Sequence, residues 1–398
     1  MSVAQKGPLA QPPTRRTVRI FLCGDVMTAR GIDQVLPHPC DPRLHESYAK
    51  SALHYVRLAE DVNGPIPRQV DPSYVWGAAL DELNCARPDA RIINLETAIT
   101  RSDSYVPKGI NYRMSPENAG CLTAARIDCC ILGNNHVLDW GSAGLLDTLD
   151  VLDKLEIKRA GAGRDLAQAT APATLHIGGG GRLVIFSFAS VTSGAPRHWA
   201  AAADRPGLNV LADLSAARAD RIVDQITQIW RPGDVVIVSI HWGENWGYEI
   251  PDDQTSFAHT LVERAPVSVI HGHSSHHAKA IEIYRNRLIL YGCGDFLNDY
   301  EGIGGYEKFR DDLALMYFAD IDLTNADLVA LEMMPLQIRR FQLVASSQAD
   351  TDWLRDTLDR QTPAFGARVE LTPSRRLALR WKQRKQQDNS GLASAAEL

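Results

Sequence analysis

The sequence predicts a layered α/β fold in which helices cover a central sheet, and two observations support this. Seven short runs of β-branched and aliphatic residues have the length and composition of buried strands. Amphipathic patterns with helical spacing lie between most of these runs. Strands that alternate with helices along a chain are typical of α/β layers.

The predicted elements follow one another in this order. The seven strands are 18–23, 91–94, 129–132, 183–188, 235–240, 267–270 and 288–291. The clearest helices are 145–155, 214–230 and 255–264. From residue 313 the pattern changes to two longer strands, 315–323 and 328–336, which are typical of a second sheet with antiparallel edges. The glycine run 178–181 separates two apolar runs and predicts a hairpin turn rather than a phosphate-binding loop.

We expect one main domain at residues 17–372, preceded by a disordered leader at residues 1–16. Residues 31–75, rich in Pro and His, form an insertion between the first strand and Trp76, and such an insertion is a candidate lid. Residues 373–398 are expected to contain a basic surface helix, 375–387, and a disordered tail.

The composition excludes several classes of protein. The 398 residues are 45% hydrophobic and 23% charged, as in globular proteins, and argue against a disordered or collagenous chain. A net charge of −6 gives no reason to expect nucleic acid or an anionic membrane surface as a partner. Seven cysteines without a Cys-x-x-Cys pair predict neither a disulfide framework nor a zinc ribbon. No apolar stretch approaches the roughly 20 residues of a membrane span, so we expect a cytoplasmic protein.

Polar side chains follow six of the seven predicted strands, at the point where each strand ends. They are Asp25, Asn94 with Glu96, Asn134 with Asn135 and His136, His241 with Trp242 and Glu244, His271 with His273 and His276, and Asp295. A single Asp after a strand is most often a helix N-cap, but ligands bind at the carboxyl ends of strands in open α/β sheets. Six such positions together predict a shared site. Its oxygen and imidazole donors suit Ca, Mg, Mn or Zn.

Several motifs resemble those of the CapA-like family, named for the poly-γ-glutamate capsule synthesis protein. In order they are GDVM at 24–27, INLET at 93–97, GNNHVLDWG at 133–141, AGAG at 160–163, VSIHWG at 238–243 and GHSSHHAKAIE at 272–282. The resemblance covers about residues 18–300. It implies a calcineurin-like metallophosphoesterase fold, an α/β/β/α sandwich with two central mixed sheets flanked by helices. It also places Asp25, Glu96, Asn135, His136, His241 and the histidines of 271–277 in the site.

The chain departs from the wider phosphoesterase pattern in ways that favour one metal ion over two. Met27 stands where that pattern has a histidine two residues after the first aspartate, and Asn94-Leu95-Glu96 replaces a Gly-Asp motif. We therefore expect one divalent ion, Ca, Mg or Mn before Zn, and no organic cofactor. The expected ligands are Asp25, Glu96, Asn135, His241 and His271.

The motifs supply carboxylates but scarcely any Arg or Lys to hold phosphate oxygens, which argues against a phosphate ester. The histidines suit acid–base catalysis near neutral pH. We assign proton transfer to a set of five residues: Asp25, His136, His273, His276 and Asp295. The candidate substrate-binding residues are Asn94, Asn134, Trp242, Glu244 and Trp246.

The CapA-like family that this chain resembles includes metal-dependent epimerases of lasso-peptide precursors. We therefore expect a peptide epimerase that moves a proton at a Cα of a ribosomal precursor peptide, with a C-terminal aromatic residue as a candidate position. Two alternatives stay open. One is a metal-dependent hydrolase of phosphoesters or γ-glutamyl amides, and the other is a non-catalytic CapA-like scaffold of polymer or peptide assembly.

Overall fold

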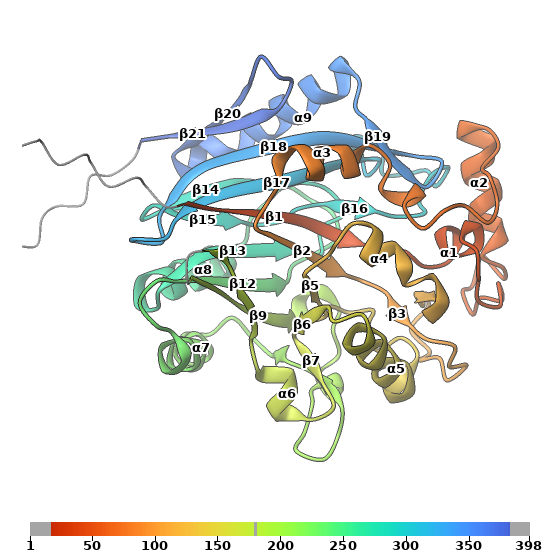
Figure 1. Ribbon diagram of the computed structural model, residues 1–398, viewed down its shortest axis with the longest axis horizontal. Coiled ribbons are helices and arrows are strands. Elements are labelled where there is room, and N and C mark those ends of the chain that lie inside the picture. The colour runs from red at the N-terminus through yellow and green to blue at the C-terminus, as the bar shows by residue number, and fades with distance from the viewer. Residues whose placement is uncertain (1–16, 179–180, 383–398) are drawn as a thin grey trace, which may run out of the picture.

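Two sheets packed face to face, with helices on both outer sides, form the centre of the computed structural model (Figure 1). The structure describes residues 17–178 and 181–382. The predicted leader at residues 1–16 and the tail at 383–398 lie outside these ranges. The four layers confirm the α/β/β/α sandwich with two mixed sheets.

The larger sheet has ten strands among the described residues. In spatial order its main path is β20 (Ala367–Leu371), β21 (Leu377–Trp381), β18 (Leu328–Arg339), β17 (Leu313–Asp322), β1 (Thr17–Val26), β2 (Ala90–Leu95), β5 (Cys129–Ile131) and β6 (Lys158–Ala160). Two short strands lie off this path, β16 (Asp295–Leu297) beside β1 and β19 (Gln342–Ala345) beside β18. β1, β2, β5, β6 and β16 are parallel, whereas β17 runs antiparallel to β1.

The smaller sheet has seven strands within the described ranges. Its order is β11 (Val210–Leu211), β9 (Arg182–Ser190), β12 (Asp234–His241), β13 (Val267–His273), β15 (Arg287–Leu290) and β14 (Ile281–Tyr284), with β8 (Ala173–His176) beside β9. The strands β9, β12, β13 and β15 are parallel. β8 and β9 pair antiparallel across the glycine run, as a hairpin requires, although residues 179–180 are not described.

Two pairs of very short strands stand apart from the main sheets, β3 (Ala98–Ile99) with β4 (Arg113–Met114), and β7 (Ala162–Gly163) with β10 (Gly207–Leu208). The helices of the described residues are α1 (Gly31–Val35), α2 (Leu53–Asn63), α3 (Ala78–Ala86), α4 (Gly120–Ala124), α5 (Gly141–Lys154), α6 (Leu166–Thr170), α7 (Ala216–Ile229), α8 (Asp252–Arg264) and α9 (Gln348–Gln361).

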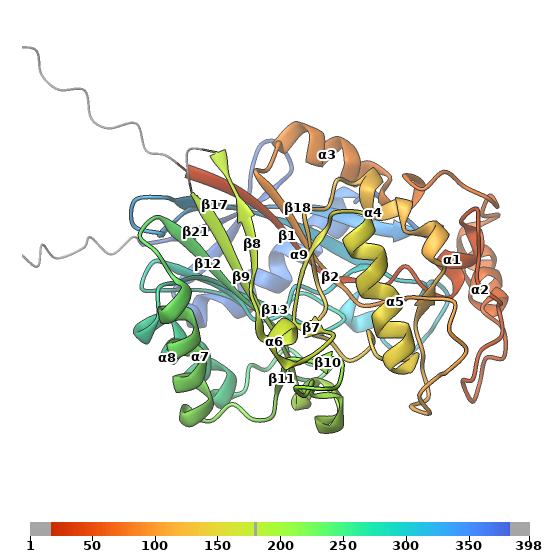
Figure 2. The same cartoon turned by 60° about the horizontal axis from the view of Figure 1, so that its bottom comes forward.

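Three apolar clusters hold the layers together. α3, α4 and α5 cover the outer face of the larger sheet, where Leu145 and Leu149 of α5 join a cluster with Phe21. α7 and α8 cover the outer face of the smaller sheet with Ile222 and Phe257 (Figure 2). The third cluster fills the space between the two sheets. Helix amphipathicity along the chain therefore predicts α5, α7 and α8 correctly.

The sequence-based expectation for the long strands after residue 313 is wrong in one respect. β17 and β18 do not start a second sheet but extend the first one, because β17 pairs antiparallel with β1 in a register that sets Phe318 opposite Phe21. Burial explains this choice. β17 is buried along nearly its whole length, so it suits the centre of a sheet rather than an edge.

The basic surface helix expected at residues 375–387 is also wrong where the structure describes the chain. Residues 377–381 form β21, which pairs antiparallel with β20 and with β18. Leu377 and Leu379 alternate along this strand and pack into the cluster between the sheets, while Arg380 is exposed. Apolar residues that recur every second position indicate a strand. The helix prediction was based on the density of basic residues and overlooked this alternation.

The insertion at residues 31–75 contains α1 and α2, which lie side by side at one end of the molecule (Figure 1). Buried Arg30 forms ion pairs with Glu46 of the insertion (3.1 Å) and with Asp299 of the core (2.5 Å). These two ion pairs link the insertion to the core. Its role as a lid stays a prediction. Within residues 17–178 and 181–382, none of the helices combines the length and apolar character needed to cross a bilayer.

Candidate metal centre

The candidate site lies between the two sheets, at the carboxyl ends of their central strands. Side chains alternate along a strand, so residues two apart share a face. Ile92 of β2 faces the cluster between the sheets, and Asn94 continues that row. In the same way His271 and His273 continue the row of Val269 on β13. The apolar rows thus end in polar residues where the two sheets meet.

Asp25 is fully buried and lies at the centre of these polar residues. Its Oδ1 accepts a hydrogen bond from Asn94 Nδ2 at 2.7 Å, and its Oδ2 accepts one from the backbone N–H of Ser274 at 3.2 Å. β1 and β16 pair in parallel so that Asp25 stands beside Asp295. Gly24 allows this close approach, since a Cβ at residue 24 would lie 1.7 Å from the carbonyl oxygen of Gly294.

His241 and His273 form a second part of the site, on neighbouring strands of the smaller sheet. Their Nδ1 atoms lie 2.7 Å apart, and His273 Nε2 is 2.9 Å from Ser239 Oγ. His273 Nδ1 is 3.8 Å from Asp25 Oδ1, and His241 Nε2 is 3.6 Å from Glu96 Oε1. His241 Nε2 is buried and has no hydrogen-bond partner among the described residues. A buried nitrogen without a partner is unfavourable unless a further group binds it.

His276 and Asp295 form a dyad on the other side of Asp25. Their Nδ1 and Oδ1 atoms are 2.8 Å apart, and Asn298 Nδ2 donates to Asp295 Oδ2 at 2.8 Å. Burial alone would lower the pKa of His276, but the Asp295 carboxylate raises it above its usual range. His276 is thus held in one orientation and favoured in its charged form.

His136 forms a separate dyad with Asp139. Its Nδ1 lies 2.7 Å from Asp139 Oδ2, and its Nε2 points toward Glu96 Oε1 at 3.8 Å. Lys108 Nζ is 2.8 Å from Asp139 Oδ1 and also contacts the backbone oxygen of Asn135. Burial lowers the pKa of His136 to about 4, so its imidazole is neutral near pH 7.

The two asparagines before His136 have different surroundings. Asn134 Oδ1 accepts the backbone N–H groups of His136 (3.1 Å) and Val137 (3.0 Å), and its Nδ2 donates to Asn94 Oδ1 (3.1 Å). Asn134 therefore stabilises the loop at 134–137 through these hydrogen bonds. Its side chain does not offer a free donor or acceptor to a substrate. Asn135 Oδ1 is buried and has no hydrogen-bond partner among the described residues, like His241 Nε2.

The donor set fits a divalent metal ion. Two overlapping groups have ligand atoms within 4.8 Å of one another, Asp25 with His241 and His273, and Asp25 with His276 and Asp295. Burial and the neighbouring Asp295 raise the pKa of Asp25 to about 7, and burial with Asp25 raises that of Glu96 well above its usual range. A cation between these carboxylates would offset the repulsion that raises both pKa values. His241, a member of the first group, has an unpartnered Nε2, and Asn135 Oδ1 is another buried acceptor without a partner among the described residues.

Two of the predicted site residues have other roles in the structure. His271, an expected metal ligand, lies outside both donor groups, and its ring nitrogens contact Ser239 Oγ at 3.0 Å and the carbonyl oxygen of Cys23 at 2.9 Å. His273 joins the donor group instead. Trp242, an expected substrate-binding residue, is buried in the outer cluster of the smaller sheet and donates its indole N–H to the carbonyl of Tyr291. Because Trp242 alternates with His241, its ring faces away from the site.

Glu244 and Trp246 line a pocket of about 620 Å³ next to the loop that follows His241. Glu244 is exposed, and the ring of Trp246 stacks on Tyr306 at 4.0 Å and lies 5.2 Å from His276. Their expected role in substrate binding stays a prediction.

The sequence did not identify Lys108, Asp139, Ser274 and Asn298. Asp139 stands in the 133–141 motif, three residues after His136, which is a usable signal for a His–Asp pair. Ser274 has a φ of 101°, a strained value that holds its N–H toward Asp25. Asn298 likewise stands three residues after Asp295, to which it donates a hydrogen bond. Lys108 carries no local signal, because only the folded chain brings it to the site. Cys293 is buried, and burial raises the pKa of its thiol well above the usual range, which does not suit it as a base.

Comparisons with known proteins agree on one family. The model of a family described as bacterial capsule synthesis protein PGA_cap matches residues 19–300. The chain is 47% identical over 358 residues to a probable polyglutamine synthesis accessory protein of Mycobacterium tuberculosis, with 89% of this chain and 94% of that protein covered. It is 26% identical over 226 residues to the PGA biosynthesis protein CapA of Bacillus subtilis, with 56% of each chain covered.

Among solved structures, the chain is similar to a novel phosphatase from Mycoplasma pneumoniae. The TM-score is 0.44 at 11% identity, with 81% of this chain and 95% of the phosphatase covered.

Proposed function

Because the chain belongs to the bacterial capsule synthesis protein family PGA_cap, we propose that it is a metal-dependent hydrolase of γ-glutamyl amide bonds. Its relatives named for polyglutamine synthesis and for capsule synthesis support a glutamine- or glutamate-derived polymer as the substrate class. The observation that carries the proposal is the buried set of donors around Asp25, with a separate histidine–aspartate dyad on each side.

The metal would be held by Asp25, His241 and His273, with Glu96 close to His241. A divalent ion bound there supplies a Lewis acid that polarises the carbonyl of the scissile amide. The oxygen and imidazole donors contain no thiolate, which agrees with a hard or borderline ion.

The two dyads would divide the proton transfers of hydrolysis between them. Asp139 fixes Nδ1–H of His136, so the Nε2 of the neutral ring is free to accept a proton from the attacking water. Asp295 holds His276 and favours its charged form, so His276 donates a proton to the departing amine. Asp25, which accepts a hydrogen bond from Asn94, stands beside Asp295 of the second dyad.

The charges around the site favour an amide over a phosphate ester. Arg30 and Lys108 are the two cations whose charge acts on His136. Each is paired with carboxylates, Arg30 with Asp299 and Glu46, and Lys108 with Asp139. A transferring phosphoryl group needs free cations around its oxygens, whereas the tetrahedral intermediate of an amide carries a single negative charge.

Epimerisation of a precursor peptide, the leading expectation from the sequence, gains no support from the names of the relatives reported above. A non-catalytic scaffold also agrees with the word "accessory" in those names. We favour hydrolysis over a scaffold because two oriented histidine–aspartate dyads in one buried site are costly to maintain without a chemical role.

The test is an assay of the full chain with short γ-glutamyl oligomers and added Mn²⁺, Mg²⁺, Ca²⁺ or Zn²⁺ in deuterium oxide. We expect new amino termini with the wild type, and none with Asp25→Asn or His273→Gln. His259→Gln is the matched control, because His259 lies on α8 and bonds to Glu282 instead. Intact oligomers that gain deuterium at Cα would favour epimerisation. Oligomers left unchanged by wild-type protein with every ion would reject catalysis in favour of a scaffold.

A further inference from the structure

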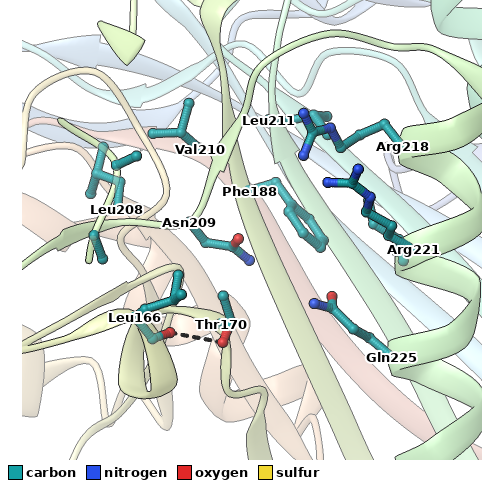
Figure 3. A pocket seen from close by; sticks show the side chains of 13 residues that line it. Leu166, Thr170, Phe188, Leu208, Asn209, Val210, Leu211, Arg218, Arg221 and Gln225 are labelled. Atoms are coloured by element: carbon teal, nitrogen blue, oxygen red, sulfur yellow. Dashed lines mark hydrogen bonds between the residues drawn. The ribbon is translucent and has the colours of Figure 1, made fainter. Parts of the chain in front are cut away.

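A second pocket lies outside the candidate metal centre, between α7, α6 and the short strands β10 and β11 (Figure 3). Its volume is about 320 Å³, enough for a ligand of the size of an amino acid or dipeptide. None of its lining residues belongs to the donor groups around Asp25. Phe188, Leu208 and Leu211 form much of its apolar wall.

The polar side of this pocket comes from one face of α7. Arg218, Arg221 and Gln225 are spaced three and four residues apart, so they lie on the same side of the helix. Figure 3 shows Arg221 and Gln225 reaching toward Phe188 and Asn209 across the pocket. No acidic residue lines the pocket, and the charge presented to a ligand is therefore positive.

The two arginines are available to different degrees. Arg218 lies 3.7 Å from Asp213, a loose ion pair. Arg221 has no ion pair or side-chain hydrogen bond within residues 17–178 and 181–382. A guanidinium that is free of protein partners and faces a pocket suits a carboxylate, which it binds with two parallel hydrogen bonds.

Gln225 adds an independent observation. Its Oε1 is buried and has no hydrogen-bond partner among the described residues. An unpartnered buried acceptor destabilises the protein, and an N–H group of a ligand would remove that penalty. Asn209 does not satisfy it in this structure, where Asn209 Nδ2 donates to the carbonyl oxygen of Ser187 at 3.0 Å.

We propose that this pocket binds an amino-acid-sized ligand with a carboxylate, a neighbouring N–H donor and a short aliphatic chain. Arg221 pairs with the carboxylate, Gln225 Oε1 accepts from the N–H, and the aliphatic chain packs on Phe188 and Leu211. An inorganic phosphate fits less well, since its oxygens would face the Gln225 oxygen and it has no apolar part to cover the wall.

The experiment is calorimetric titration of the full chain, kept metal-free with a chelator so that hydrolysis plays no part. The probes are γ-glutamyl-glutamate, propionate and inorganic phosphate. We expect γ-glutamyl-glutamate to bind at one site and to bind more tightly than the other two probes. Arg221→Gln should weaken its binding about tenfold or more. Gln225→Leu should weaken it too, because the acceptor for the N–H is gone.

Arg231→Gln is the matched control, since Arg231 is exposed and does not line the pocket. The affinity of the Arg231→Gln variant for γ-glutamyl-glutamate should equal that of the wild type. The proposal is overturned if Arg221→Gln binds γ-glutamyl-glutamate as tightly as the wild type, if phosphate binds more tightly, or if no probe binds at about 10 mM. Because binding is measured without metal, a failure here leaves the hydrolase proposal standing, and the reverse also holds.

Discussion

Asp25 connects the two halves of the candidate metal centre, because it belongs to both groups of donors. The groups differ in their histidines. His241 and His273 lie on strands of the smaller sheet, whereas His276 follows in the next loop and is held by Asp295. We place the ion with the first group and proton transfer with the second, and this division can be tested residue by residue.

Asp295→Asn separates the two assignments. We expect the variant to keep its bound ion but to lose about 10²- to 10⁴-fold in hydrolysis rate, since His276 loses the carboxylate that orients and charges it. Rate measurements should be paired with metal analysis of the same sample. Loss of the ion from Asp295→Asn would place the metal between Asp25, His276 and Asp295 instead.

Gly24→Ala tests the close contact behind Asp25. An added Cβ would lie 1.7 Å from the carbonyl oxygen of Gly294, so β1 and the chain before Asp295 must move apart. We expect a loss of about 1–3 kcal/mol in the free energy of unfolding, measured by chemical denaturation. Gly233→Ala is the comparison for a glycine with no atom near its Cβ position, although its positive φ adds backbone strain of its own. Unchanged stability of Gly24→Ala would contradict the packing described.

At the scale of elements, β13 shows both what the sequence predicts and where it fails. The apolar run 267–270 identifies the strand, but the strand continues to His273. His271 and His273 share a face by alternation, so their spacing cannot tell which one is a ligand. The distinction comes from the other sheet, where the carbonyl oxygen of Cys23 occupies His271 and Asp25 lies near His273.

β21 offers a direct test of the corrected C-terminal element. Leu379 is buried between the sheets, and Leu379→Ala should lower the free energy of unfolding by about 2–5 kcal/mol. The neighbouring Arg380 is exposed, and Arg380→Ala should change it by less than about 1 kcal/mol, the usual range for an exposed ion pair such as the one with Glu370. On a solvent-exposed helix the two substitutions would have similar small effects, so equal values would speak against the strand.

At the scale of the whole molecule, the sequence predicted the layers better than the site. Buried strands and amphipathic helices carry local periodicity, and the polar residues that follow these strands lie at the carboxyl ends of parallel strands in the two sheets. Lys108 reaches the site through a loop without any pattern. Trp242 was misassigned because the alternation that points His241 inward turns its neighbour outward.

Metal removal should destabilise the whole fold, since an ion held by Asp25, His241 and His273 would join strands of both sheets. Binding to the folded state alone adds about 2.7 kcal/mol when free metal is 100 times its Kd. We expect a chelator to lower the Tm of the wild type in thermal unfolding monitored by circular dichroism. The double variant Asp25→Asn, His273→Gln should show no shift with the chelator. An equal shift in both proteins would mean that the chelator acts elsewhere.

The position of β1 at the centre of the larger sheet has a consequence for how the chain matures during translation. β2 can cover one edge of β1 early, but the other edge waits for β17, whose Asp322 pairs with Thr17. At about 5–20 residues per second, the roughly 300 intervening residues take about 15–60 s to synthesise. Throughout that time the edge of β1 that pairs with β17 stays unpaired in the nascent protein. Demand for chaperones should therefore end only once β17 has emerged.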